Sequence, residues 1–461
     1  MNTNEIINKL GIRLNDMQEA ACKALTEKNS DVVILSPTGT GKTYAYLIPL
    51  SAQIDATSDE LQAVVLLPGR ELALQSADVL KKMGTGLRTM ALYGGRPTMD
   101  EHRKLRKVKP QIVFATPGRL NDHLDKGNIN VDSVCTLVID EFDKMLQMGF
   151  QNEMSQIIAK LPAVKRHILL SATDAEEIPS YLRNGFKPLR LDFLPENGFD
   201  SERVNLFKVM SPDKDKLGTL AKLLVKLGNE SSIVFLNYRD SVERTAQFLR
   251  DQKFTVSMFH GGLDQESRER SLYLFSNGSA NILVCTDLAS RGLDIPNIDN
   301  IIHYHIPESE DAYIHRVGRT ARWHSHGRAF FILSSEENIP DYVSTPTESG
   351  NKPIISEYKL EDDDSVDQDA KELHLGSIPK PKISTIYIGK GKKDKISKGD
   401  IVGFLCKKGG LSGNELGRID VFERYSYAAV PREKLRQVIQ LTRNEKIKGK
   451  KTIIEEATLG F

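Results

Sequence analysis

The chain is poor in the features that mark secreted and membrane proteins. It has only four cysteines in 461 residues, at Cys22, Cys135, Cys285 and Cys406, and none forms a C-x-x-C pair. This argues against a disulfide framework and a zinc site, and it fits a reducing compartment. No apolar run is long enough to span a bilayer, and residues 1–11 lack a basic region followed by an apolar core. We therefore expect a cytoplasmic protein with no membrane partner.

Charge is nearly balanced overall but unevenly distributed. The formal net charge is +1, yet residues 382–461 contain 18 Lys and Arg against 9 Asp and Glu, while the rest of the chain contains 45 against 53. A small basic module suggests a polyanion as partner. A solvated basic surface explains a bare charge count equally well, so both interpretations stay open.

Short apolar, β-branched runs alternate with longer helical stretches. Runs that are buried on both faces and separated by helices predict parallel sheets covered by helices, which is an α/β fold. Several runs end in Pro, Gly, Thr or Asp, which places polar residues where open α/β sheets bind ligands. The runs lie at residues 32–35, 64–67, 112–116, 137–140 and 168–173 in the first half, and at 233–236, 256–259, 282–285 and 301–305 in the second.

The pattern divides the chain into four segments. Pro, Asn and Gly interrupt it near residues 195–204, where we expect two lobes to join. A second interruption, between about Glu336 and Lys382, contains five prolines and the acidic run at residues 361–364, a composition typical of a solvated linker. The predicted segments are a first lobe at residues 1–203, a second lobe at 204–340, a linker at 341–381 and a small domain at 382–461.

The first apolar run leads directly into a loop that is typical of phosphate binding. The loop is Ser36, Pro37, Thr38, Gly39, Thr40, Gly41, Lys42 and Thr43. Glycines let successive backbone N–H groups face an anion at a helix N-terminus. Lys42 supplies a charge for the β- and γ-phosphates, and the Thr43 hydroxyl is suited to Mg²⁺. Ser36 stands where the general pattern has glycine, but the strand–loop–helix context still favours a nucleotide site over a chance turn.

Two adjacent carboxylates end the apolar run at residues 137–140. Asp140 can reach the magnesium shell, and Glu141 can orient or deprotonate the attacking water. Asp-Glu alone usually marks a solvated strand end, so this interpretation depends on the phosphate loop upstream. We expect Thr43 and Asp140 as metal ligands.

An arginine-rich segment runs from His315 to Arg322 and contains Arg316, Arg319 and Arg322. Arginines inserted from across a cleft stabilise the charge that develops on a transferred phosphoryl group. Considered by itself, the segment is better interpreted as a basic surface helix.

Taken together, these segments resemble the DEAD-box RNA helicases of helicase superfamily 2. The resemblance covers roughly residues 10–332, and its short motifs occur in the family's order. They are Gln18; residues 36–43; 68–73; Gly94 and Gly95; 116–119; Asp140, Glu141, Phe142 and Asp143; 171–173; 233–235; His260 and Gly261 with Gln265 and Arg268; Thr286 and Asp287 through Asp294; and 315–322.

The resemblance implies two RecA-like lobes that close on ATP, Mg²⁺ and one RNA strand. Lys42, Asp140, Glu141, Arg319 and Arg322 would carry catalysis. Gln18 would read the adenine edge, and Asp294 would contact the nucleotide on closure. Asp143, Ser171, Thr173 and His315 would couple hydrolysis to lobe closure. The implied RNA-backbone contacts, which give RNA preference without sequence readout, are Arg70, Gly94, Gly95, Thr116, Arg119, Arg268, Thr286 and Arg291.

Some positions depart from the family pattern. Phe142 replaces the third letter of the name-giving tetrapeptide, and Gly69 replaces the usual Thr. The residues around Gln18 also differ, and no aromatic residue before Gly11 corresponds to the one that stacks on adenine.

Residues 384–457 resemble the RRM-like C-terminal domain of bacterial DbpA-type helicases. The segments that carry this resemblance are residues 386–389, 391–395, 399–403, 410–413, 417–421, 425–431 and 448–457. In that group the domain binds a hairpin of large-subunit ribosomal RNA during ribosome assembly. Tyr387, Tyr425 and Tyr427 could stack on bases, but strand tyrosines are more often packed in a core.

We therefore expect a monomeric, ATP-dependent RNA helicase that unwinds RNA duplexes locally, with large-subunit ribosomal RNA as partner. An ATP-gated clamp that holds RNA without separating strands has the same motifs. A DNA translocase of the same superfamily is disfavoured by Gln18, by residues 140–143 and by the C-terminal domain.

Overall fold

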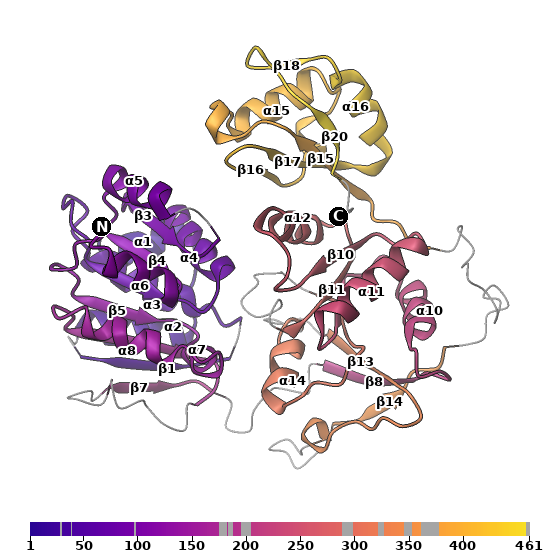
Figure 1. Ribbon diagram of the computed structural model, residues 1–461, viewed down its shortest axis with the longest axis horizontal. Helices are drawn as coiled ribbons and strands as arrows, with labels where there is room; N and C mark the ends of the chain where they lie inside the picture. Colours follow the sequence, from indigo (N-terminus) through magenta and orange to yellow (C-terminus); the bar gives the residue numbers. More distant parts are fainter. Residues whose placement is uncertain are drawn as a thin grey trace. The chain divides into compact units, whose positions relative to one another are not determined.

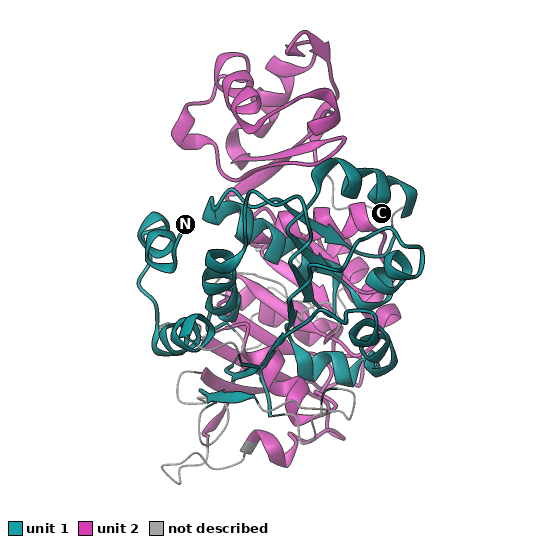
Figure 2. Ribbon diagram, turned by 90° about the vertical axis from the view of Figure 1, so that its left-hand side faces the viewer, with its two compact units in different colours: residues 1–199, 292–294 teal, residues 200–291, 295–461 magenta. Residues whose placement is uncertain are grey.

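The computed structural model describes residues 1–27, 30–37, 39–95, 98–174, 182, 188–194, 204–287, 298–320, 327–344, 353–360 and 378–457. Thr38, Arg291, Asp294 and Arg322, which the sequence singles out, lie outside these residues. The chain forms two compact units, which meet in sequence at residues 199 and 200 (Figure 2). None of the helices in the described part of the chain is both long and apolar enough to cross a membrane.

The first unit is an α/β lobe built on one parallel sheet of seven strands in the order β3-β4-β2-β5-β6-β1-β7. Figure 1 labels β3, β4, β5, β1 and β7 of this sheet. The strands are short and mostly buried, as expected for strands covered on both faces. They are β1 Val32–Leu35, β2 Ala63–Leu66, β3 Thr89–Leu92, β4 Ile112–Ala115, β5 Thr136–Ile139, β6 Arg166–Ser171 and β7 Leu189–Asp192. The helices are α1 Thr3–Leu10, α2 Asp16–Glu27, α3 Lys42–Gln53, α4 Arg70–Met83, α5 Thr98–Val108, α6 Pro117–Asp125, α7 Phe142–Gln147 and α8 Gln151–Ala159.

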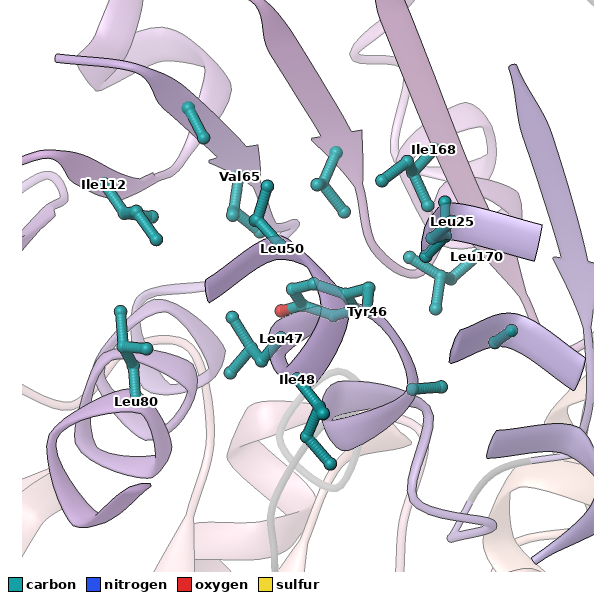
Figure 3. Packing of buried hydrophobic residues seen from close by; sticks show 14 of the residues in the cluster. Leu25, Tyr46, Leu47, Ile48, Leu50, Val65, Leu80, Ile112, Ile168 and Leu170 are labelled. Atoms are coloured by element: carbon teal, nitrogen blue, oxygen red, sulfur yellow. The ribbon is translucent and has the colours of Figure 1, made fainter. Parts of the chain in front are cut away.

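Aliphatic side chains from the sheet and from α2, α3 and α4 form one face of the core of this lobe. Tyr46 of α3 lies among them and is fully buried beside Leu47 and Leu50 (Figure 3). The other face packs against α6, α7 and α8 through residues such as Met145 and Ile157. Because helices cover both faces of the sheet, its strands are continuous apolar runs in the sequence. The polar loops that follow the strands therefore lie at the carboxyl ends of the sheet, where open α/β sheets bind ligands.

The second unit contains another parallel sheet of seven strands, in the order β10-β11-β9-β12-β13-β8-β14. The strands are β8 Val204–Met210, β9 Ser232–Phe235, β10 Val256–Phe259, β11 Ile282–Cys285, β12 Asn300–His303, β13 Gly327–Leu333 and β14 Ile355–Glu357. The helices are α10 Leu217–Leu227, α11 Arg239–Asp251, α12 Gln265–Ser276 and α14 Glu310–Val317, with a 3-10 turn at Asp341–Ser344. The repeat of one topology confirms the prediction of two tandem α/β lobes.

Both ends of the predicted linker at residues 341–381 contain residues that pack on the second lobe. β14 pairs in parallel with β8, and Tyr358 and Leu360 pack against the core of the second lobe. Ile378 is buried in the same core. Prolines and charges dominate the composition of this stretch, but a few apolar residues anchor both of its ends. The acidic run at residues 361–364 lies outside the described residues.

A small α+β domain completes the second unit. Its antiparallel sheet has the order β16-β17-β15-β20, and helices α15 and α16 pack on one face through residues such as Ile401 and Val438. The strands are β15 Ile383–Ile388, β16 Ile419–Val421, β17 Ser426–Pro431, β18 Lys446–Ile447, β19 Lys450–Lys451 and β20 Ile454–Glu456, and the helices are α15 Lys398–Lys407 and α16 Leu435–Thr442. Short 3-10 turns lie at Lys392–Asp394, Gly413–Glu415 and Arg432–Lys434. This confirms the predicted fold class of the C-terminal domain.

Candidate active site

The carboxyl edge of the first sheet carries two groups of predicted site residues. Because the strands are parallel, all of their following loops lie at one edge. The phosphate loop follows β1, Asp140 follows β5, and Ser171 ends β6, so these three neighbouring strands carry the nucleotide residues. The loops after β2, β3 and β4 carry the predicted RNA contacts. The two groups of predicted residues therefore lie side by side along the same carboxyl edge of the sheet.

The phosphate loop has the backbone geometry that anion binding requires. Gly39 and Gly41 adopt positive φ angles of 86° and 84°, which other residues rarely adopt. Lys42 begins α3, and its Nζ donates to the carbonyl oxygens of Ser36 at 2.5 Å and Pro37 at 3.0 Å. The lysine side chain therefore lies over its own loop, and its ammonium group donates to carbonyl oxygens of that loop.

The acidic residues after β5 share a buried, charged cluster with Lys42. Burial and the neighbouring Glu141 carboxylate raise the pKa of Asp140 to about 7, and burial lowers the pKa of Lys42 to about 8 although Asp140 opposes this shift. A carboxyl group so placed is stabilised in its charged form by a cation, which fits Asp140 and the Thr43 hydroxyl as ligands of Mg²⁺.

Sequence reasoning missed Lys144, which completes this cluster. Its side chain is 1% exposed, and its Nζ lies 2.8 Å from Oε2 of Glu141. Glu141 itself has a positive φ of 54°, an uncommon conformation for a residue with a side chain. Glu141 is the N-cap of α7 and Lys144 lies three residues later, so the opposite charges at this spacing are the signal that would have found the pair.

Asp143 connects the ends of β5 and β6. Its Oδ2 accepts hydrogen bonds from the Thr173 hydroxyl at 3.1 Å and from the Ala172 main-chain N–H at 3.3 Å. The Ser171 hydroxyl donates to the Thr173 carbonyl at 2.5 Å. The structure therefore brings together three of the four residues expected to couple hydrolysis to closure. The fourth, His315, is buried in α14 of the second unit.

Gln18 lies directly against the phosphate loop. Its Nε2 donates to the Gly41 carbonyl at 3.1 Å, and its Oε1 accepts from the Asn15 main-chain N–H. A Cβ atom on Gly41 would lie 2.5 Å from this amide nitrogen, so any other residue would displace the Gln18 amide and would also have to adopt the positive φ angle. The Asn15 side chain donates to the Thr40 carbonyl. Asn15, which replaces the family's usual residue, thus adds a second tether between α2 and the loop.

The predicted RNA contacts of the first lobe converge at the ends of β2, β3 and β4. Arg70 begins α4, and its Nη1 lies 3.4 Å from the Gly94 carbonyl. A Cβ on Gly95 would lie 2.7 Å from the same nitrogen. Thr116 caps β4 by donating its main-chain N–H to the Leu92 carbonyl, and Arg119 follows in the first turn of α6. The structure therefore groups all five.

In the second lobe, Arg316 organises the carboxyl edge of the sheet. It is fully buried, and its guanidinium forms a bidentate ion pair with Asp287 at 2.5 and 2.6 Å. It also donates to the Asn237 side chain at 2.8 Å and to the His305 carbonyl at 2.7 Å. One arginine thus ties together the ends of β9, β11 and β12. Residue spacing alone does not distinguish Arg316 from the other arginines of this segment, and no structural role is predicted for it.

Arg319 lies one turn beyond Arg316 and is buried, with its charge acting on Cys285 at the end of β11. Thr286 follows the same strand. Arg268 lies in the first turn of α12 and donates to the carbonyls of Leu263 at 3.0 Å and Gly261 at 2.5 Å. The described members of the predicted set in this lobe therefore all lie near the carboxyl ends of β10, β11 and β12.

The tyrosines of the C-terminal domain are packed, as expected for strand tyrosines. Tyr425 and Tyr427 are buried against Tyr273 of α12, and the Tyr273 and Tyr427 ring centroids are 5.1 Å apart. The Tyr425 hydroxyl donates to Glu269 at 3.0 Å, and Asn277 donates to Thr385 at 2.8 Å. The sheet thus has its own helices on one face and α12 of the second lobe on the other.

Comparison with known proteins agrees with this architecture. Models of the DEAD/DEAH box helicase, of the helicase conserved C-terminal domain and of the DbpA RNA binding domain match residues 15–179, 215–324 and 385–456. The ATP-dependent RNA helicase DbpA of Escherichia coli K12 is 32% identical over 454 residues, covering 96% of this chain and 94% of that protein. DbpA of Bacillus subtilis 168 is 30% identical over 456 residues, with the same coverage.

Solved structures of similar proteins include complexes with nucleotide and RNA. Mss116p bound to single-stranded RNA and AMP-PNP has a TM-score of 0.68 at 26% identity, covering 77% of each chain. Dbp5 of S. cerevisiae bound to RNA and ADP BeF3 has a TM-score of 0.63 at 25% identity, covering 72% of this chain and 87% of that one.

A phosphate loop with a carboxylate pair in one parallel-sheet lobe, followed by an arginine segment in a second, defines a two-lobed helicase. The family matches and the nearly full-length similarity make this more specific. The chain belongs to the DEAD-box ATP-dependent RNA helicases, which hydrolyse ATP, and it carries a DbpA-type RNA-binding domain.

Proposed function

We propose that this helicase uses Mg²⁺ and ATP to separate short duplexes in large-subunit ribosomal RNA, acting as a cytoplasmic monomer during ribosome assembly. The observation that carries the proposal is that the carboxyl edge of one sheet holds both the predicted nucleotide residues and the predicted RNA contacts, in a chain with a basic C-terminal domain. Bound Mg²⁺ would offset the charge of the triphosphate. Lys42 binds the phosphates, Thr43 and Asp140 hold the metal, and Glu141 orients and deprotonates the attacking water.

The second lobe supplies what the first lacks. Arg319, with Arg322, stabilises the charge that develops on the γ-phosphoryl group, and Asp294 contacts the nucleotide on closure. Gln18 selects adenine. Asp143 and Thr173, which are hydrogen-bonded to each other, couple ATP hydrolysis to lobe closure. They do so together with Ser171 and His315.

RNA binding in the core rests on backbone contacts. Helix N-termini and glycine turns present N–H groups to phosphates, and arginines add charge, so binding needs no particular sequence. The contacts are Arg70, Gly94, Gly95, Thr116 and Arg119 in the first lobe and Arg268, Thr286 and Arg291 in the second. Closure on one strand bends it, so that its partner strand cannot remain paired.

Strand release measures this function directly. With a short RNA duplex carrying a fluorescent strand, we expect ATP turnover to release the strand, and single-stranded RNA to stimulate ATPase activity more than DNA of the same sequence. If ATP instead produces long-lived RNA retention while the duplex stays paired, the protein is a clamp. Equal stimulation by DNA would contradict RNA specificity.

The C-terminal domain provides the preference for ribosomal RNA. Because α12 covers the tyrosine face of the sheet, RNA must bind to the basic surfaces elsewhere on the domain. These include the β18–β19 hairpin, where Lys446 and Lys451 are exposed. Lysines there offer phosphate contacts, while stacking on Tyr425 or Tyr427 would require α12 to leave.

Deleting residues 382–461 should preserve basal ATPase activity and abolish the preference for large-subunit ribosomal RNA over unrelated RNA. Both lobes keep their own cores, since this deletion leaves Ile378 in place. The measurement is the RNA concentration that gives half-maximal ATPase stimulation, for each RNA.

The double variant Lys446→Glu/Lys451→Glu tests the same role without uncovering Tyr273. It should weaken stimulation by ribosomal RNA, whereas Lys23→Glu, at an exposed position of α2, should not. A truncated protein that still prefers ribosomal RNA would disprove the targeting role.

A further inference from the structure

A largely buried hydrogen-bond network joins α5 and α6, next to the predicted RNA contacts that follow β2, β3 and β4 of the first lobe. Thr98 and Glu101 lie three residues apart on α5, and Arg119 and His123 lie four residues apart on α6. Such spacings place each pair on one face of its helix. The Glu101 side chain is 5% exposed, that of Arg119 is 11% exposed, and that of His123 is fully buried.

Two donors converge on a single oxygen of Glu101. Arg119 Nε donates to Oε2 at 2.7 Å, and His123 Nε2 lies 3.1 Å from the same atom. A carboxylate only accepts hydrogen bonds, so Nε2 of His123 must carry a proton. Asn128 Nδ2 lies 3.2 Å from the other ring nitrogen, Nδ1, and the Asn128 main-chain N–H donates to the His123 carbonyl at 2.9 Å. The histidine ring is therefore fixed in both tautomer and orientation.

A second contact holds the guanidinium from a different nitrogen. Arg119 Nη1 donates to the Thr98 hydroxyl at 2.9 Å, and that hydroxyl donates to Asp122 Oδ2 at 3.1 Å. Arginine side chains otherwise sample many rotamers, and ordering one on binding costs free energy. Here the buried Glu101 and the partly buried Thr98 order the side chain before any ligand arrives.

We propose that Glu101 and His123 are positioning residues that hold Arg119 in its RNA-binding orientation, so that RNA meets an arginine already ordered. The inference rests on the proposed function through the role of Arg119 as an RNA contact. Neither Glu101 nor His123 touches RNA. His123 acts at one remove, by fixing the carboxylate that fixes the arginine, much as buried partners orient the ligands of metal sites.

The alternative is that the network only fastens two helices together, and the two readings give different results. A fastening role predicts lower thermal stability alone. A positioning role predicts that more RNA is needed for half-maximal ATPase stimulation, while the maximal rate at saturating RNA changes little. The helicase offers a matched control, because His167 Nδ1 pairs with Asp31 at 3.1 Å at the opposite edge of the same sheet.

The experiment compares His123→Phe, Glu101→Gln and His167→Phe in the full-length protein, with Tm measured for each. We expect His123→Phe and Glu101→Gln to raise the half-stimulating RNA concentration about five- to twentyfold, the effect of weakening one charge-assisted contact. His167→Phe should leave it unchanged at a comparable loss of Tm. His123→Gln, whose amide can still donate to Glu101, should lie between wild type and His123→Phe.

If His123→Phe raises the half-stimulating RNA concentration no more than His167→Phe, the network is a fastener and the inference is wrong. Arg119→Ala separates this failure from that of the proposed function. When Arg119→Ala weakens stimulation and His123→Phe does not, only the positioning role fails. When Arg119→Ala itself has no effect, the assignment of Arg119 as an RNA contact fails with it.

Discussion

Replacing Arg319 by alanine should lower kcat for RNA-stimulated ATP hydrolysis by a factor of about 10³ or more, the effect expected for an arginine that stabilises a phosphoryl-transfer transition state. Nucleotide affinity should change little, since the phosphate loop, Asp140 and Gln18 all lie in the first lobe. Arg319→Lys should recover only a small part of the rate, because lysine keeps the charge but loses the planar fork.

Arg328→Ala is the matched control for Arg319. Arg328 lies at the start of β13 in the same lobe, pairs with Glu230 and belongs to the amino edge of the sheet, away from the candidate site. Steady-state ATPase rates at saturating RNA, with binding of a fluorescent nucleotide measured in parallel, distinguish the two. An Arg319→Ala protein that keeps more than about a tenth of the wild-type rate would remove the arginine finger from the account.

Glu141→Gln should lower kcat by about 10² to 10⁴, the usual contribution of a general base, and should leave ATP binding intact. Glutamine keeps the shape and the hydrogen-bonding reach but cannot accept the proton of the attacking water.

Lys42→Ala should behave differently. It removes a cation that lies over the phosphate loop, and it should abolish turnover with weaker nucleotide binding.

The contrast between these two variants is more informative than either rate alone. Isothermal titration with ADP and single-turnover hydrolysis of ATP measure binding and chemistry separately. Glu153→Gln, on α8, serves as the carboxylate control. Normal hydrolysis in both Glu141→Gln and Lys42→Ala would overturn the assignment of the nucleotide site.

Strands that are buried on both faces could be predicted from the sequence because their composition leaves little choice. β1 spans the predicted residues 32–35, and β10 and β11 also match the predicted runs. The predicted runs do not include β3, β7, β8, β13 or β14. β3, with the sequence Thr-Met-Ala-Leu, is half-buried at its centre and lies at the edge of the sheet, so its apolar signal is weak. β13 does have the expected signal, because its residues 329–333 are continuously apolar and buried.

Contacts between distant segments were beyond reach from the sequence. Nothing local distinguishes Arg316, which is buried and paired with Asp287, from Arg319 three residues later. Likewise, no pattern in residues 425–427 reveals that α12 covers them, because the partner residue Tyr273 lies about 150 positions earlier. Apolar anchors such as Leu360 and Ile378 were hidden within a segment whose composition is that of a linker.

The nucleotide residues were predictable for a different reason. Phosphate chemistry requires a short list of side chains at fixed spacings. Residues 36–43 and Asp140-Glu141 can therefore be recognised from the local sequence alone. Lys144 was missed because a lysine beside acidic residues is usually a surface ion pair, whereas this one is buried.

The central claim is that neither lobe is complete and that Arg319 of the second lobe acts on a triphosphate held by the first. A crystal structure of the helicase with AMP-PNP, Mg²⁺ and single-stranded RNA tests it most directly. We predict that a guanidinium nitrogen of Arg319 lies within hydrogen-bonding distance of a γ-phosphate oxygen, about 2.7–3.1 Å. A γ-phosphate contacted only by first-lobe residues, with Arg319 turned to solvent, would contradict the account.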